Sequence, residues 1–148
     1  MRYMVIVKGP ENLAASGPPP ASLMEEIGRL CEEGVKNGTL ASFGGLFPTA
    51  SGTRMRITKG KLVTTDGPFT ESKEVIGGFT ILNVASREEA LAEARSFMEL
   101  HRTHWPEWEG EIEIRRMYEE QDDVRETQIE ASRALQHAGG ARSNPASR

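Results

Sequence analysis

The sequence contains a single cysteine, Cys31, among 148 residues. One cysteine forms no disulfide within the chain and builds no thiolate cage around a metal. Cys31 falls in an apolar pattern with helical spacing and has no evident base beside it in sequence. We therefore interpret it as a small buried hydrophobic residue rather than as a reactive thiol.

Concentrated basic charge and long hydrophobic runs are also missing. The formal net charge is −4, and the lysines and arginines are scattered along the chain. Because a nucleic-acid surface needs a concentrated basic field, nucleic acid is excluded as the main partner. The first apolar run, Tyr3 to Val7, is too short for a signal peptide or a membrane span. We predict a cytoplasmic protein without a membrane partner.

Motifs that hold cofactors and metals are absent as well. The sequence has no P-loop, nucleophile elbow or dinucleotide fingerprint, and Gly44-Gly45 lacks the spacing that nucleotide binding requires. His101 and His104 are three residues apart and share a helix face, but no third metal ligand accompanies them. We predict neither a cofactor nor a metal.

The sequence does carry the periodicities of a globular α+β domain. Hydrophobic residues make up 37% and charged residues 27%, which is a balance typical of folded proteins. Two capping-box pairs, Ser22 with Glu25 and Ser86 with Glu89, predict the starts of two helices. We expect helices at 22–37 and 86–105, and strands at 2–8, 39–47, 53–58, 61–65, 75–84 and 111–117.

This order of elements predicts a ferredoxin-like split βαβ domain over residues 1–120, with both helices on one face of the sheet. Residues 121–148 are polar and are expected to form a tail that is partly helical or disordered. The sheet face without helices is expected to carry Phe79 and Ile81. Since a small domain rarely leaves such a face uncovered, we predict a homodimer arranged as a dimeric α/β barrel.

A hairpin is predicted between residues 53 and 65, with Lys59-Gly60 as its tight turn. Met55 and Ile57 alternate with arginines, so we expect the two apolar side chains to lie on a buried face.

The most distinctive segment runs from Asp66 to Phe79. It begins Asp-Gly-Pro-Phe-Thr-Glu-Ser-Lys-Glu and continues to Gly77-Gly78-Phe79. Together with the opening Arg-Tyr-Met and the segment from Gly44 to Pro48, it resembles the DGPF branch of the YCII-related proteins over residues 1–118. The resemblance implies a ferredoxin-like subunit of a dimeric barrel, with a cleft between helices and sheet.

The same resemblance bears on chemistry. In the wider YCII-related group a His–Asp pair has been proposed to transfer protons, but this sequence has no histidine among its first hundred residues. Some relatives are linked to sigma-factor genes, which suggests a regulatory role as an alternative. We therefore hold two hypotheses: an unknown small molecule bound, or processed by acid/base chemistry, in a homodimer, and a non-catalytic regulatory or scaffold domain.

Two residues are candidates for catalysis. Asp66 serves either the turn itself, as aspartates at such positions commonly do, or as a general acid or base. His101, on the apolar stripe of the second helix, is the alternative proton-transfer residue. The candidate ligand-binding residues surround the turn and the strand after it: Phe69, Glu71, Lys73, Glu74 and Phe79.

Overall fold

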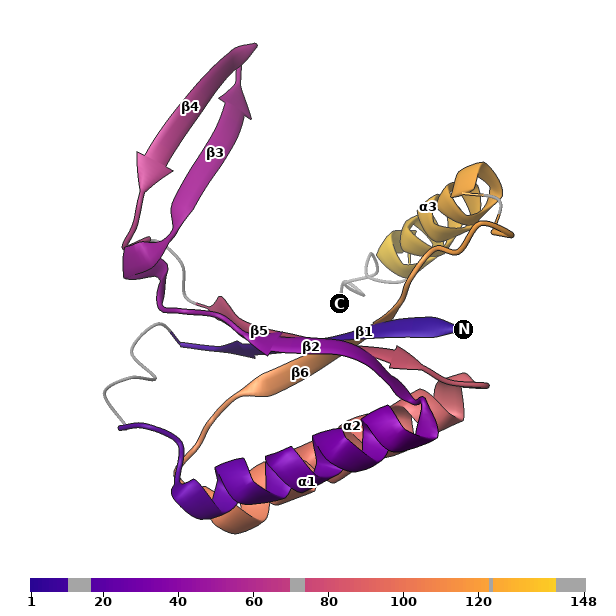
Figure 1. Cartoon of the computed structure of the whole chain (residues 1–148). Helices are drawn as coiled ribbons and strands as arrows, with labels where there is room; N and C mark the ends of the chain where they lie inside the picture. The colour runs from indigo at the N-terminus through magenta and orange to yellow at the C-terminus, as the bar shows by residue number, and fades with distance from the viewer. Residues whose placement is uncertain (11–16, 70–73, 123, 141–148) are drawn as a thin grey trace, which may run out of the picture. The chain divides into compact units, whose positions relative to one another are not determined.

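The computed structural model describes residues 1–10, 17–69, 74–122 and 124–140, and Figure 1 shows its elements. The chain forms two compact units, Met1–Met117 and Tyr118–Arg148. The second unit contains one helix, α3 (Val124–Gly140). The first unit contains every strand of the described chain and two helices, and the candidate sites lie within it.

Four strands of the first unit make one antiparallel sheet. They are β1 (Arg2–Gly9), β2 (Leu40–Gly45), β5 (Val75–Asn83) and β6 (Glu111–Arg116), and they lie in the order β2-β5-β1-β6. Strand β1 is therefore interior, as its almost wholly apolar sequence predicts. With helices between β1 and β2 and between β5 and β6, this is the split βαβ arrangement, and the predicted fold is confirmed.

Helices α1 (Ala21–Asn37) and α2 (Arg87–His104) cover one face of this sheet (Figure 1). The core beneath them joins Tyr3, Val5 and Leu82 of the sheet to Ala90 and Ala94 of α2. Alanine leaves little side chain between a helix and a sheet, so α2 approaches the strands closely at this end.

The two predicted helix starts have different outcomes. At α2 the hydroxyl of Ser86 accepts a hydrogen bond from the Glu89 amide (3.1 Å), and the Glu89 carboxylate accepts one from the Ala85 amide (2.7 Å). At α1 the prediction is wrong, because the helix begins at Ala21 after Pro20 and has no side-chain cap. The extended prolines run directly into the first turn, which places Ser22 inside the helix.

The hairpin consists of β3 (Thr53–Thr58) and β4 (Lys61–Asp66). Lys59 and Gly60 have φ values of 49° and 75°, which identifies the predicted tight turn as type I′. The expectation that Met55 and Ile57 are buried is wrong, since they are 68% and 77% exposed. Alternation predicts which side chains share a face, but it does not show that the same chain covers that face.

None of the helices in the described ranges is long and apolar enough to cross a membrane.

The serine caps allow a matched test of the helix starts. We expect Ser86→Ala to lower the free energy of unfolding by about 1 kcal/mol, because the Glu89 amide loses its acceptor. Ser22→Ala removes no cap and should change the stability by less than about 0.5 kcal/mol. Urea unfolding followed by circular dichroism measures both variants. If both variants lost the same free energy of unfolding, the assignment of a cap to Ser86 and not to Ser22 would be contradicted.

Candidate functional site

The Asp-Gly-Pro-Phe turn closes the base of the β3–β4 hairpin. Asp66 is exposed at the end of β4, and its Oδ1 accepts a hydrogen bond from the hydroxyl of Thr53 on β3 (2.9 Å). The Gly67 amide then donates to the carbonyl of Gly52 (2.8 Å). These bonds join the two ends of the hairpin. Within the described residues the Asp66 carboxylate bonds across the hairpin to Thr53, and not to the backbone amides of its own turn as aspartate at such positions commonly does.

The rest of the turn packs against the short 3-10 helix η2 (Thr49–Ser51). The Phe69 amide donates to the Thr49 hydroxyl (3.1 Å), and the Arg54 guanidinium lies 4.0 Å from the centre of the Phe69 ring. A Cβ atom on Gly67 would lie 1.7 Å from the Thr49 carbonyl oxygen, so only glycine fits there. The tetrapeptide thus fixes the direction in which the hairpin leaves the domain.

Glu74 lies near an ion-pair cluster at the end of β1. Lys8 Nζ is 2.6 Å from Glu111, 3.1 Å from Glu113 and 3.9 Å from Glu74. The hydrogen bonds that the Lys8 ammonium donates to Glu111 and, second, to Glu113 raise the pKa of Lys8, so this side chain stays cationic. Glu71 and Lys73 lie outside the described residues.

A cavity of about 400 Å³ lies between the helices and the sheet, where the family resemblance implies a cleft. Its walls are mostly apolar and come from both helices, from β1, β2 and β5, and from the segment after α2. The side chains most relevant to ligand binding are Val7, Cys31, Phe43, Glu93, Phe97, His101, Trp105 and Trp108.

Glycines form part of the cavity floor. Gly45 of β2 pairs with Gly78 of β5, and the Leu46 amide donates to the Gly77 carbonyl (2.9 Å). Four glycines from the two strands line the cavity: Gly44, Gly45, Gly77 and Gly78. Because they carry no side chains, the sheet backbone itself is accessible to a ligand here.

His101 is the buried ionisable residue of this cavity, with 7% of its surface exposed. Its Nδ1 lies 3.0 Å from the Phe97 carbonyl oxygen, which can only accept, so Nδ1 carries the hydrogen. Burial lowers the pKa of His101 despite that hydrogen bond, so the neutral imidazole is favoured. Nε2 then has a free lone pair, and it has no hydrogen-bond partner among the described residues.

Two aromatic rings hold the imidazole in place. The ring centres of Phe97 and Trp108 lie 4.4 and 4.6 Å from that of His101. Helix α2 ends before Pro106, as the sequence predicts, and the Trp108 amide donates to the Trp105 carbonyl (2.9 Å). This turn folds Trp108 back over His101.

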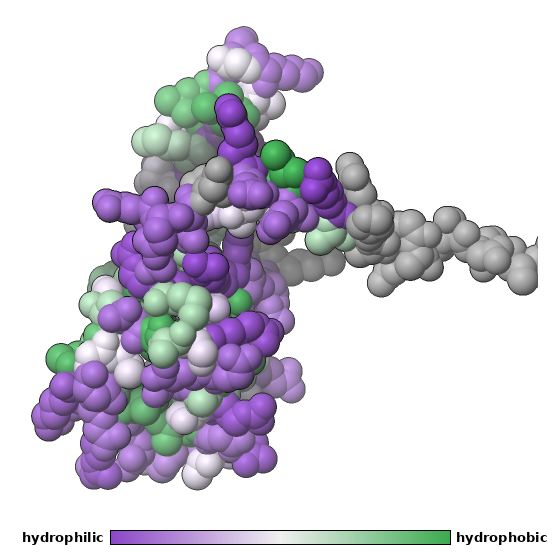
Figure 2. Space-filling view, turned by 90° about the vertical axis from the view of Figure 1, so that its right-hand side faces the viewer, coloured by the Kyte–Doolittle hydropathy of each residue, from purple (hydrophilic) through white to green (hydrophobic). Residues whose placement is uncertain are grey.

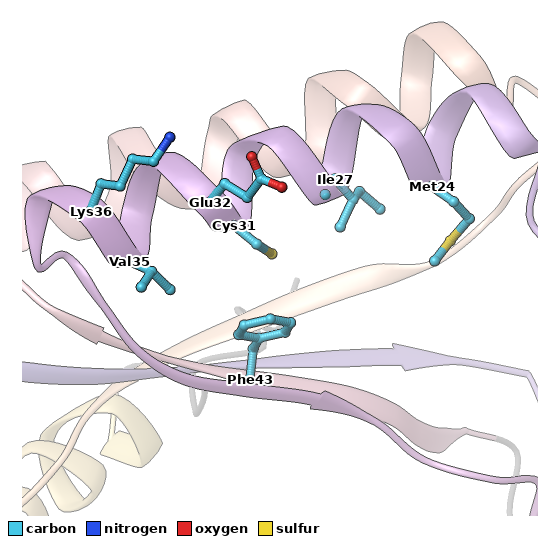
Figure 3. Close-up of a pocket in the computed structure, with 8 residues that line it drawn as sticks. Met24, Ile27, Cys31, Glu32, Val35, Lys36 and Phe43 are labelled. Atoms are coloured by element: carbon cyan, nitrogen blue, oxygen red, sulfur yellow. The ribbon is translucent and has the colours of Figure 1, made fainter.

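A second hollow, a groove of about 460 Å³, runs between α1 and β2 at the edge of the sheet. Figure 3 shows Phe43 pointing from β2 toward α1, beneath Cys31 and Ile27. These three residues and Met24 line both the groove and the cavity. Cys31 is half-buried, not fully buried as expected from the sequence. This burial raises the pKa of the thiol, which favours the protonated form.

The structure therefore divides the candidate residues between two places. His101 and Phe79 are among the cavity-lining residues, although the strand register places the Phe79 side chain with Ile6 on the other face of the sheet. Asp66, Phe69 and Glu74 do not line the cavity. Asp66 and His101 consequently do not line one site. Glu93 was missed by sequence reasoning, although it precedes His101 by eight residues and so falls on the same helical stripe.

Comparison with known proteins identifies the family. The sequence profile of the YCII-related domain matches residues 1–101, and the chain belongs to this family. An uncharacterized protein of Rhizobium meliloti (strain 1021) is 31% identical over 97 residues, which cover 64% of this chain and 78% of that protein. The range that the family profile matches, residues 1–101, contains the Asp-Gly-Pro-Phe turn and the glycine pairs Gly44-Gly45 and Gly77-Gly78. It ends at His101.

The environment of His101 predicts a dependence of stability on pH. Because burial lowers its pKa in the folded state, the unfolded chain takes up this proton first as the pH falls below about 6.5. The stability is therefore complete above that pH and declines below it. We expect His101→Gln to lose less stability than the wild type between pH 7.5 and pH 5, as measured by urea unfolding. His104→Gln is the control and should follow the wild type; identical curves for all three proteins would refute the assignment.

Proposed function

We propose that this protein binds a small, largely apolar molecule in the cavity between the helices and the sheet. The observation that carries the proposal is His101: a buried imidazole that lines a mostly apolar cavity, favours the neutral form, and has no hydrogen-bond partner for Nε2 among the described residues. A buried acceptor without a partner costs about 1–3 kcal/mol, and a ligand that donates a hydrogen bond removes this cost. The preferred ligands therefore carry a hydroxyl or N–H group.

The dimensions of the cavity set the size of the ligand. A volume of about 400 Å³ is at the lower end of the range of pockets for small molecules. Glu93 precedes His101 by eight residues, which is about 12 Å along a helix. The ligand that fits has an apolar body, with its donor group at the His101 end.

The same geometry supports acid/base chemistry as the enzymatic form of this function. A neutral imidazole between Phe97 and Trp108 is oriented to accept a proton at Nε2. Asp66 does not line the cavity and is occupied in the turn, so His101 takes the role of the base. The alternative, a regulatory or scaffold domain of the DGPF type, needs no internal cavity, and the open space beside His101 favours binding.

We also propose that the protein is a homodimer. The sheet face opposite the helices, called the open face below, carries Met4, Ile6, Phe79 and Ile81, as the strand register requires. Four apolar side chains on one face of a small domain favour burial against a second copy.

Intrinsic fluorescence can test ligand binding directly. The chain has only two tryptophans, Trp105 and Trp108, and both line the cavity. We expect phenol to change their emission and to bind about three- to tenfold more tightly than anisole, which cannot donate to Nε2. His101→Phe should remove this preference, while His104→Phe should keep it. Equal affinities of the wild type for phenol and anisole would contradict the role of Nε2.

A second variant blocks the cavity without touching His101. A Cβ atom on Gly45 meets no heavy atom within 4 Å, so Gly45→Val should leave the fold intact and fill the floor. We expect phenol affinity to fall by at least about tenfold. Ala41→Val, an exposed change on the same strand, should bind phenol as the wild type does. Undiminished binding by Gly45→Val would place the ligand elsewhere.

A further inference from the structure

We propose that the ligand of the cavity is an aromatic amine, with its ammonium group on Glu93 and a phenolic hydroxyl group on His101. This inference rests on the ligand binding proposed above and names the chemical class of the ligand. Three properties of the cavity carry it: a carboxylate in the wall, the charge of the other lining residues, and the spacing of the polar groups along α2.

Glu93 places a carboxylate in the wall of a mostly apolar cavity. Hydrophilic residues cover much of the face shown in Figure 2, so a carboxylate is common on the surface and exceptional in such a wall. Glu93 is also partly buried. A charged group that is partly withdrawn from water is stabilised by a hydrogen-bond donor, and most strongly by a cation.

Glu93 has no such partner among the described residues, since its carboxylate makes neither a hydrogen bond nor an ion pair with any of them. Two other glutamates of the same helix are engaged. The Glu89 carboxylate accepts a hydrogen bond from the Ala85 amide, and Glu99 pairs with Arg102. The carboxylate of Glu93 is therefore available to a ligand.

The charge of the lining favours a cation over an anion. In the described part of the chain the lining residues include three ionisable side chains, Cys31, Glu93 and His101, and no lysine or arginine. Burial raises the pKa of the thiol and lowers the pKa of the imidazole, which favours the uncharged form of each. A carboxylate in such a lining attracts an ammonium group and repels a second carboxylate.

The spacing along α2 sets the shape of the ligand. Glu93, Phe97 and His101 follow one another at intervals of four residues, and all three line the cavity. Each interval is about 6 Å along a helix, so an aromatic side chain lies between the two polar ones. The Phe97 ring is also in contact with the imidazole, at 4.4 Å between ring centres. A ligand whose aromatic ring packs on Phe97 thus has one end at Glu93 and the other at His101.

The two ends of the ligand differ in the donor that suits them. Hydrogen bonds between charged groups are roughly twice as strong as neutral ones, so the ammonium group is placed on Glu93. The neutral hydroxyl group then donates to Nε2 of His101. Tyramine has this arrangement, because its hydroxyl and ammonium groups lie at opposite ends of an aromatic ring. A cavity of about 400 Å³ is in the range of pockets for molecules of this kind.

Calorimetric titration of the full chain tests the ammonium group with tyramine and two analogues. In 4-propylphenol a methyl group replaces the ammonium group, and in 4-hydroxyphenylacetate a carboxylate stands at that end. We expect the wild type to bind tyramine at least about tenfold more tightly than 4-hydroxyphenylacetate. Equal affinities for these two compounds would contradict the inference.

Glu93→Gln keeps the size of the side chain and removes its charge. We expect this variant to lose at least about fivefold more affinity for tyramine than for 4-propylphenol. Glu88→Gln is the matched control, because it removes the same charge from an exposed position of α2, and it should bind tyramine as the wild type does. The same tyramine affinity in both variants would overturn the assignment of the ammonium group to Glu93.

Charge reversal gives a result that partial unfolding cannot imitate. Glu93→Lys replaces the carboxylate with an ammonium group, so the variant should bind 4-hydroxyphenylacetate more tightly than tyramine. Circular dichroism shows that the variant is folded. A folded Glu93→Lys protein that still prefers tyramine would show that the amine lies elsewhere.

The outcomes separate this inference from the function proposed above. If phenol binds through His101 while tyramine affinity does not depend on Glu93, the aromatic amine is overturned and the phenol site stands. If neither phenol nor tyramine binds, both proposals are overturned. The homodimer at the open face is tested separately by light scattering, in which a monomer at about 10 µM would contradict it.

Discussion

The packing of α2 on the sheet is the constraint on which the cavity depends. At the N-terminal end of α2, Ala90 and Ala94 are fully buried against Tyr3 and Leu82, so the helix lies close to the strands. Further along the helix, Phe97 and His101 replace the alanines, while glycines replace side chains in β2 and β5. Large residues on the helix above a bare backbone leave a space beside the imidazole. The cavity therefore follows from the order of small and large residues along two elements.

This arrangement separates the parts of the domain by their physical roles. The Asp-Gly-Pro-Phe turn is the most recognisable sequence feature. Its hydrogen bonds brace the base of the hairpin, and neither Asp66 nor Phe69 lines the cavity. The cavity is lined by the glycines of the same family pattern, Gly44-Gly45 and Gly77-Gly78, and by helix residues such as His101 that carry no motif. A conspicuous tetrapeptide can thus brace a hairpin, while the buried histidine of the cavity lies in an apolar stripe of α2.

The sequence was sufficient for the fold because the fold depends on local periodicity. The apolar run of β1, the alternation of β6 and the capping box at Ser86 are each contained within ten residues, and each is confirmed. The site depends on contacts that arise from strand register and from an irregular turn rather than from local periodicity. Gly45 lies beside Gly78 only because β2 pairs with β5 in one register, and Trp108 meets His101 only through the turn at Pro106. No local pattern predicts either contact. The burial expected for Met55 failed for a related reason, since it required a second layer of side chains that the described residues do not provide.

The central claim is that His101 is neutral, protonated at Nδ1, and free to accept a hydrogen bond at Nε2. Nitrogen-15 NMR of the imidazole tests this directly, because the two tautomers and the imidazolium have distinct shifts. At neutral pH we expect the Nδ1–H tautomer, with the Nε2 resonance moving when phenol is added. An imidazolium, an Nε2–H tautomer, or an Nε2 resonance that phenol leaves unchanged would contradict the claim.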